Sequence, residues 1–310
     1  MSSLSNREVL RRLELTVTRR LDGLLQGDHR GLVPGHGSEL GEAREYQPGD
    51  DVRRIDWNVT ARMQTTHVRE TIADRELELW MLIDQSASLD FGTANHEKRD
   101  LALEAAGAVG FLTARSGNRL GGMLLRPGGR NVIVPARSGR THLQALLARV
   151  MDAPRIDGAG PTDLGAGMYQ LAAGMRRRGL AVVISDFLDG DSLTGPFGWE
   201  SALRRLAVRH DVLAVEVIDP RELELPPVGV LQVVDAETGA LREVQTADPR
   251  LRARYAAAAA SQRAAIDTAI QGSGADHLVL RTDRDWLLDL ARFVLLRRKR
   301  FESVPPRAGR

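Results

Sequence analysis

The 310-residue chain contains no cysteine, few aromatic residues and no long uncharged apolar segment. Without cysteine there is no disulfide, no thiolate metal site and no cysteine nucleophile, and the chain suits a reducing compartment. Aromatic residues make up only 4% of the chain, so its core must be built from Leu, Val, Ile and Ala. The apolar share of 43% is nevertheless that of a globular protein.

Charge and hydropathy exclude two further classes of protein. The formal net charge is only +2, which is not the basic excess of a dedicated nucleic-acid binder, and we expect no nucleic-acid partner. The first thirty residues carry charges throughout and have no apolar signal core. No window reaches the ~18 uncharged apolar residues that cross a bilayer. We therefore expect a cytoplasmic protein without an integral membrane segment.

The most informative stretch is LELWMLIDQSASLDFGT at residues 77–93. Its apolar first half predicts a strand buried on both faces, as in the middle of a parallel sheet. Asp84, Ser86 and Ser88 follow with the spacing D-x-S-x-S, at the strand end where open α/β sheets bind ligands. One carboxylate and two hydroxyls on alternate residues can face a common centre. Such hard oxygen ligands suit Mg²⁺ or Mn²⁺.

Two further segments add oxygen ligands to the same predicted edge. The Gly-rich loop at 158–163 opens a helix and carries Thr162, with Asp163 placed to cap that helix. A second apolar strand at 179–184 ends in a Ser–Asp pair that contains Asp186. The candidate ligands are therefore Asp84, Ser86, Ser88, Thr162 and Asp186. The alternative interpretation is that these residues cap helices and form turns, which are common roles of Ser, Thr and Asp.

Apolar strands alternate with helical segments along most of the chain, which predicts a parallel sheet covered on both faces. A hairpin is expected at 126–134 and a second one at 228–246, and Asp283 is expected to cap the last helix. The predicted strands that complete the sheet are 120–125, 212–218 and 276–281, and the main helices are 94–114, 141–151, 199–209 and 249–271.

The N-terminal quarter combines a predicted helix at 5–25 with a charged segment at 41–70. In the charged segment several aspartates face several arginines, namely Asp50, Asp51 and Asp56 with Arg44, Arg53, Arg54 and Arg62. We interpret it as a latch in which Arg–Asp pairs pin the segment onto the main domain; a solvated loop with local ion pairs is the alternative. The predicted division is helix and latch at 1–75, the main domain at 76–300 and a disordered tail at 301–310.

The candidate ligand set resembles the metal-ion-dependent adhesion site (MIDAS) of von Willebrand factor A-like domains. The resemblance implies an α/β fold with a doubly wound, mostly parallel sheet flanked by helices, here with an N-terminal helix/loop extension and a small β-hairpin. It also implies one Mg²⁺ or Mn²⁺ held by the five residues named above. In that family the open position of the ion accepts a carboxylate from a partner protein.

A second resemblance is narrower. The run REYQPGDDVRRIDWNVTAR at 44–62, followed by HVRE and IDQSASLDFG, is similar to the bacterial family catalogued as domain of unknown function 58. VISDF, the ETG hairpin and DHLVLRTDRDWLLDL match as well, so the resemblance covers about residues 30–300. Members of that family often lie in operons with MoxR-type AAA+ ATPases. The resemblance implies a non-enzymatic, metal-dependent interaction module, an adaptor or chaperone-like partner that binds a MoxR-type ATPase or its client through a carboxylate.

Two other functions stay open. A metal-assisted hydrolase would need a general base beside the ion, and Ser86 could be a nucleophile with His67 or His96 as base, although no G-x-S-x-G elbow surrounds it. A nucleic-acid-binding protein would use the arginines at 176–178 and 297–300, which lie at predicted helix C-terminal ends where basic residues suit the helix dipole. The GPTDLG loop lacks the G-K-[ST] of a P-loop, so we expect no ATP hydrolysis.

Overall fold

The computed structural model describes residues 6–25, 43–47, 52, 55–69, 78–114, 118–155, 161–188, 193–234 and 240–303. The chain divides into two compact units, one made of Met1–Val33 with Leu77–Arg310 and the other of Pro34–Glu76. The described elements of the larger unit are α1 (Asn6–Leu25), β3 (Glu78–Asp84), η2 (Ala87–Asp90), α3 (Lys98–Ala114), β4 (Arg119–Leu125), η3 (Pro127–Gly129), β5 (Val132–Arg137), α4 (Arg140–Met151), α5 (Leu164–Gly174), β6 (Gly179–Ser185), α6 (Glu200–Arg209), β7 (Asp211–Ile218), α7 (Pro220–Leu223), β8 (Val230–Val234), β9 (Leu241–Gln245), α8 (Pro249–Gly272), β10 (Asp276–Arg281) and α9 (Trp286–Ser303).

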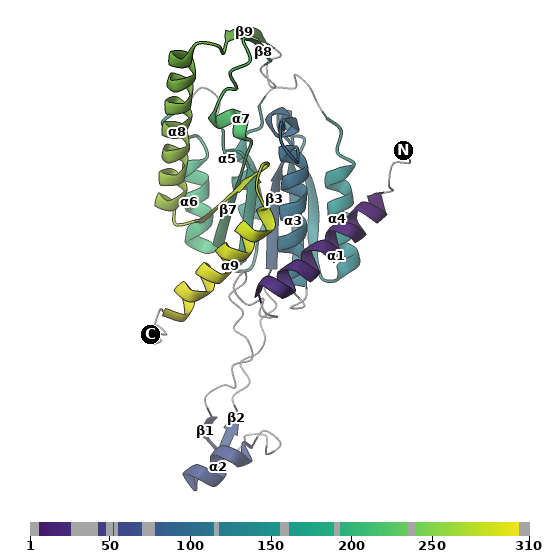
Figure 1. Cartoon of the computed structure of the whole chain (residues 1–310). Coiled ribbons are helices and arrows are strands. Elements are labelled where there is room, and N and C mark those ends of the chain that lie inside the picture. Colours follow the sequence, from purple (N-terminus) through teal and green to yellow (C-terminus); the bar gives the residue numbers. More distant parts are fainter. Residues whose placement is uncertain are drawn as a thin grey trace. The chain divides into compact units, whose positions relative to one another are not determined.

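A six-stranded sheet in the order β10-β7-β6-β3-β4-β5 forms the centre of the larger unit (Figure 1). Its strand pairs are parallel except for β4 with the edge strand β5. The chain first passes from β3 to β4 and later returns to β6 on the other side of β3. The strand order therefore reverses between β3 and β6, which is where open α/β sheets bind ligands. The predicted doubly wound, mostly parallel sheet is confirmed, and β8 pairs with β9 as the predicted second hairpin.

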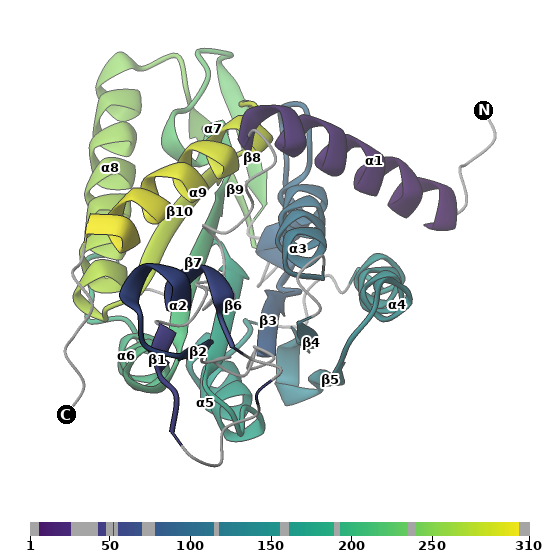
Figure 2. The same ribbon diagram turned by 90° about the horizontal axis from the view of Figure 1, so that it is seen from below.

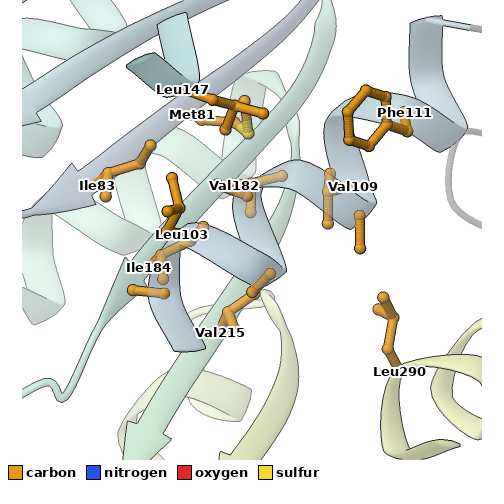
Figure 3. Close-up of a cluster of buried hydrophobic side chains, with 14 of the residues drawn as sticks. Met81, Ile83, Leu103, Val109, Phe111, Leu147, Val182, Ile184, Val215 and Leu290 are labelled. Carbon is orange, nitrogen blue, oxygen red and sulfur yellow. The ribbon is translucent and has the colours of Figure 1, made fainter. Parts of the chain in front are cut away.

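Helices cover both faces of this sheet (Figure 2). Every residue of β3 and of β6 is buried, because side chains alternate between the two faces of a strand. Met81 and Ile83 join a core with α1, α3, α4 and α9, part of which is drawn in Figure 3. Trp80 and Leu82 point the other way, into a second core with α5, α6 and α8. The continuous apolar runs of the sequence are explained by this burial on two sides.

The N-terminal helix α1 belongs to the larger unit. Its apolar stripe, made of Leu10, Leu13, Val17 and Leu21, is buried in the core that contains α3, α4 and α9. The region predicted from the sequence, 1–75, combines this helix with the charged segment. The structure instead separates the two, because an amphipathic helix gains stability by burying its stripe against an existing core.

The smaller unit contains the antiparallel pair β1 (Ala43–Glu45) and β2 (His67–Arg69) with the helix α2 (Trp57–Met63) between them in sequence. Asp56 caps α2, and its Oδ1 accepts hydrogen bonds from the backbone amides of Asn58 at 3.0 Å and Val59 at 3.2 Å. Trp57 is 71% exposed. Other charged residues of the predicted latch lie outside the described residues, namely Asp50, Asp51, Arg53 and Arg54, and the latch stays a prediction.

The last helix differs from its prediction at both ends. Asp283 does not cap it but pairs with Arg281 at 2.9 Å, and Asp285 accepts the backbone N–H of Leu288 at 3.3 Å. A cap must stand directly before the first turn, and α9 begins at Trp286. The helix continues to Ser303, past the predicted start of the tail, and residues 304–310 lie outside the described part. Neither α9 nor any other described helix is long and apolar enough to cross a membrane.

Candidate metal centre

The five candidate ligands come together at the carboxyl edge of the sheet. The strands β3 and β6 lie side by side with Ile83 opposite Ile184, so their last residues end at one level. The loops after these two strands and the loop before α5 enclose a cavity of about 400 Å³. Its lining includes all the predicted ligands, Asp84, Ser86, Ser88, Thr162 and Asp186.

Asp84 is held by three hydrogen bonds and is only 3% exposed. Its Oδ1 accepts the backbone N–H of Ser86 at 3.0 Å and the hydroxyl of Thr162 at 3.0 Å. Its Oδ2 accepts the hydroxyl of Ser185 at 2.7 Å. Ser185 was not among the predicted ligands. Its place at a strand end was visible in the sequence, but its contact with Asp84 depends on the pairing of β3 with β6.

The two serines of the D-x-S-x-S run meet because the chain turns into the short helix η2. The backbone N–H of Leu89 donates to the carbonyl of Ser86 at 3.1 Å, which closes this turn. The Oγ atoms of Ser86 and Ser88 then lie 3.0 Å apart. Both hydroxyls line the cavity beside Asp84. A local turn therefore converts the alternate spacing of the sequence into one cluster of oxygens.

Asp186 is paired with a buried lysine that was not among the predicted site residues. Lys98, the first residue of α3, is fully buried, and its Nζ lies 2.9 Å from Asp186 Oδ2 and 2.5 Å from Glu222 Oε1. The other oxygen of Asp186 accepts the backbone N–H of Leu188 at 3.2 Å. Lysines at the start of a helix are ordinarily exposed, so nothing in the sequence pointed to this position.

Aromatic packing fixes the backbone directly after Asp186. Phe187 has a φ of +55°, a left-handed conformation that is rare for a bulky residue. Its ring is fully buried and meets Trp199 edge-on with ring centroids 5.3 Å apart. The indole N–H of Trp199 donates to the carbonyl of Phe187 at 3.2 Å. Such conformations persist only where the surroundings determine them and are concentrated at functional sites.

The two carboxylates differ in their electrostatic state. Burial and the neighbouring charge of Asp186 raise the pKa of Asp84 to about 6, although its hydrogen bonds oppose the shift. Burial also disfavours the charged form of Asp186, but the ammonium of Lys98 outweighs it and holds the pKa of Asp186 below its usual value. Only one of these two buried carboxylates, Asp186, thus has a cation among the contacts described for it. A further positive charge beside Asp84 would relieve the remaining repulsion.

The chemistry of these side chains fits a hard divalent cation. They offer only carboxylate and hydroxyl oxygens, the ligands that Mg²⁺ and Mn²⁺ prefer. Within the described ranges, no group of three or more His, Cys, Asp or Glu side chains is placed to hold a metal ion. Hydroxyls of Ser86, Ser88 and Thr162 would therefore have to complete the set of ligands, together with water.

His96, one of the two histidines considered as a base for Ser86, lies elsewhere. His96 lines a different cavity, beside α1 and α9, where its Nδ1 is 3.6 Å from Glu104 Oε2. His67 belongs to the smaller unit, and its Nδ1 lies 2.7 Å from the carbonyl oxygen of Thr65. The hydroxyl of Ser86 contacts another serine. The geometry gives no support to a serine nucleophile with His96 as its base.

One arginine in each of the two clusters, Arg178 and Arg297, has structural partners. Arg178 donates to a backbone carbonyl at the end of α6 at 3.3 Å. Arg297 is 2% exposed and lies 2.6 Å from Asp276 and 3.3 Å from Asp211. These contacts join α9 to the amino ends of β7 and β10, and they favour a structural role over phosphate binding.

Comparison with solved structures gives low similarity. The chain is similar to an aerotolerance-related membrane protein from Bacteroides fragilis, with a TM-score of 0.45 and 12% identity over 72% of this chain and 99% of that chain. It is also similar to von Willebrand factor type A from Catenulispora acidiphila, with a TM-score of 0.37 and 13% identity over 74% of this chain and 43% of that chain. Because these scores are low, the fold rests on the order and direction of its own strands.

Sequence comparison gives much stronger matches. An uncharacterized protein of Mycobacterium tuberculosis is 54% identical over 290 residues, which cover 94% of this chain and 89% of that protein. The model of the family described as protein of unknown function DUF58 matches residues 42–265. This match spans the predicted latch and all five candidate ligands, and it confirms the family expected from the motif at 44–62. The chain belongs to the DUF58 family of proteins of unknown function.

Proposed function

We propose that this chain is a protein-interaction module that binds its partner through a divalent cation, Mg²⁺ or Mn²⁺, at the carboxyl edge of the sheet. The observation that carries the proposal is the convergence of the five oxygen-bearing side chains of three loops on one cavity. A cation held there would offer an open coordination position to a carboxylate of the partner, as in a MIDAS.

The residues of the chain would hold the ion in a preformed setting. Asp84 is oriented by Ser185 and Thr162 before any ligand arrives, so little side-chain entropy would be lost on binding. Ser86 and Ser88 present their hydroxyls from the same loop. Asp186 faces the cavity from the next strand and would act directly or through a water molecule.

The lining of the cavity supports binding rather than catalysis. Among the described residues that line it there is no histidine or glutamate. A third carboxylate in the lining, Asp163, caps α5 by accepting the backbone N–H of Ala166 at 2.8 Å. A metal-assisted hydrolase needs a general base beside the metal-bound water, and no described side chain of the lining is arranged for that role. We therefore infer a module that is not an enzyme.

Membership of the DUF58 family supports the choice of partner. The family resemblance implies a role as an adaptor or chaperone-like partner of a MoxR-type AAA+ ATPase, acting on that ATPase or on its client. We infer that an aspartate or glutamate of this partner completes the coordination of the ion. A carboxylate that is already partly desolvated in a folded partner binds a dication directionally and strongly.

Calorimetric titration with Mg²⁺ and Mn²⁺ tests the metal site on full-length protein stripped with EDTA. The wild type should bind one ion, and Asp84→Ala should weaken binding by about 100-fold or more, because a buried carboxylate ligand is lost. Asp211→Ala is the matched control, since Asp211 lies at the amino end of β7, at the opposite edge of the sheet. Equal binding by the Asp84 and Asp211 variants would reject the site.

A pull-down of the MoxR-type ATPase of the same organism tests the partner. Wild type should capture the ATPase in Mg²⁺ and not in EDTA, whereas Asp84→Ala should capture little in either condition. Equal recovery by both proteins in both conditions rejects the metal-bridged mechanism.

A further inference from the structure

Lys98 lies at the centre of a buried charge network on one side of the candidate metal centre. It is fully buried and bridges Asp186, at the end of β6, and Glu222 in α7. Glu222 is itself fixed, since its Oε2 accepts the backbone N–H of Asp219 at 3.1 Å and lies 3.3 Å from Arg263. Lys98 therefore has two anchored carboxylates as partners, and its ammonium has a fixed place.

The network continues away from the cavity through Arg263, Glu216 and His277. Arg263 lies 2.7 Å from Glu216, and it also donates to the carbonyl of Asp186 at 3.0 Å. His277 is 3.0 Å from Glu216 and 2.7 Å from Asp267. Burial would lower the pKa of His277, but these two carboxylates raise it above its usual value. Glu216 therefore has its own partners in Arg263 and His277.

The charged groups in and beside the cavity leave two negative charges. Four carboxylates, Asp84, Asp163, Asp186 and Glu222, are opposed by two cations, Lys98 and Arg263. A bound dication would bring this balance to zero. Without the charge of Lys98 the same groups would carry three negative charges when empty and one when loaded.

We propose that Lys98 is an internal counter-cation of the metal centre, which holds Asp186 in place when no metal is bound and lowers the affinity of the centre for a dication. This inference rests on the proposed function. In the metal-free protein the ammonium offsets the repulsion between the two carboxylates, so the centre stays ordered. In the loaded protein it removes the residual negative charge that would repel the carboxylate of a partner.

A counter-cation differs from a member of an ordinary buried ion pair in how its loss changes the affinity for the metal. Removing one member of a buried pair always destabilises the protein, because the other charge is left unpaired. A purely structural Lys98 would therefore support both stability and metal binding. The counter-cation role predicts opposite changes, in which loss of the ammonium destabilises the metal-free protein but strengthens metal binding.

Titration of full-length, EDTA-stripped variants with Mg²⁺, read by calorimetry, tests the inference. Lys98→Met, which keeps the length of the side chain without its charge, should bind Mg²⁺ about tenfold more tightly or better, since a nearby positive charge is removed. Its melting temperature without metal should fall below that of the wild type, and Mg²⁺ should raise it more than in the wild type. Unchanged or weaker Mg²⁺ binding by Lys98→Met overturns the inference.

Glu222→Gln gives a second measurement of opposite sign. The amide can still accept the N–H of Asp219, but the charge balance near the cavity rises by one and Lys98 keeps only Asp186 as a charged partner. This variant should bind Mg²⁺ more weakly than the wild type. If Lys98→Met does not fold without metal, Glu222→Gln still tests the inference. Equal or tighter Mg²⁺ binding by Glu222→Gln contradicts the counter-cation role of Lys98.

Arg297→Met is the matched control, since it removes another buried cation that bridges two carboxylates, Asp211 and Asp276, at the opposite edge of the sheet. It should lower the melting temperature and leave the Mg²⁺ affinity unchanged. A shift in its Mg²⁺ affinity as large as that of Lys98→Met overturns the local role of Lys98. If the wild type binds neither Mg²⁺ nor Mn²⁺, the proposed function itself fails, and a result of that kind is distinct from failure of the Lys98 inference alone.

Discussion

The hydroxyl of Ser185, the last residue of β6, donates a 2.7 Å hydrogen bond to Oδ2 of Asp84, the last residue of β3. Ser185 Oγ also accepts the backbone N–H of Phe187 at 3.1 Å. One hydroxyl thus joins the ends of two central strands and the turn that carries Asp186. Its role is to orient the carboxylate that the candidate metal centre depends on.

Ser185→Ala should therefore weaken both the fold and the metal centre. Loss of a hydrogen bond to a buried carboxylate should lower the free energy of unfolding by about 1–3 kcal/mol. Misorientation of Asp84 should lower Mg²⁺ affinity by roughly 10- to 100-fold, the usual effect of losing a partner of a metal ligand. Urea unfolding and calorimetry measure the two effects. Ser201→Ala, at an exposed helix position, is the control, and a Ser185 variant that behaves like it contradicts the orienting role.

Gly179, the first residue of β6, lies against the neighbouring strand β3. A Cβ atom at this position would stand 2.0 Å from the backbone carbonyl oxygen of Glu78, and a backbone atom between paired strands has no room to move. Gly179→Ala should lower the free energy of unfolding by about 3 kcal/mol or more. Gly174→Ala is the control, since its Cβ would meet nothing within 4 Å and the helix should gain up to ~1 kcal/mol. Chemical denaturation of the two variants compares them directly.

Asp219 holds α7 in place from a fully buried position. Its carboxylate accepts hydrogen bonds from the hydroxyl of Thr93 at 2.6 Å, the hydroxyl of Thr282 at 2.7 Å and the N–H of Arg221 at 2.9 Å. Burial would raise the pKa of Asp219, but these donors hold it below its usual value. A carboxylate with a lowered pKa stabilises the fold above its unfolded pKa and loses this contribution as the pH falls through the folded pKa.

Asp219→Asn should accordingly lower the free energy of unfolding at pH 7 by about 2–4 kcal/mol, because its amide N–H would face donors. The difference from the wild type should shrink at acidic pH, below the ordinary aspartate pKa. Unfolding measured from pH 3 to pH 7 checks both the size and the trend. The control is Asp248→Asn, in which an exposed helix cap is replaced by an equally good one. If Asp219→Asn is as stable as this control, the hydrogen bonds of the Asp219 carboxylate do not stabilise the fold.

The raised pKa of Glu104 predicts that stability depends on pH in the opposite direction to the contribution of Asp219. Burial and the neighbouring charge of Asp100 raise the pKa of Glu104 to about 7. In the unfolded chain this group loses its proton near its ordinary value of 4.5. Between about pH 4.5 and pH 7 the folded state therefore binds more protons than the unfolded state. Stability should fall as the pH rises through this window.

Glu104→Gln should remove this contribution, because the amide stays neutral in both states. The variant should be more stable than the wild type at pH 8 by roughly 1–3 kcal/mol and nearly equal to it at pH 4. Melting curves across pH 4–8 provide the measurement. Parallel curves for the two proteins would contradict a raised pKa of Glu104 in the folded state.

The sequence alone predicted the fold class well, because burial on both faces leaves a clear mark. The strands β3 and β6 appear as unbroken apolar runs, and the helices that cover them follow each run in turn. The helix cap at Asp163 was equally predictable, since it depends on a residue three positions away. The assignment of a cap to Asp283 failed because it needed the helix start to within two residues, and pattern alone does not define that point.

The candidate ligands show the division between sequence and tertiary structure most clearly. The spacing of Asp84, Ser86 and Ser88 is a local property of one turn, and the sequence determined it together with the strand that precedes it. That Thr162 and Asp186 reach the same cavity follows from the pairing of β3 with β6. The buried Lys98 was decided by tertiary structure alone, since its charge is held between carboxylates 88 and 124 residues away in the chain. Contacts at such separation leave no periodic pattern, because they arise only once the sheet and its helices have packed together.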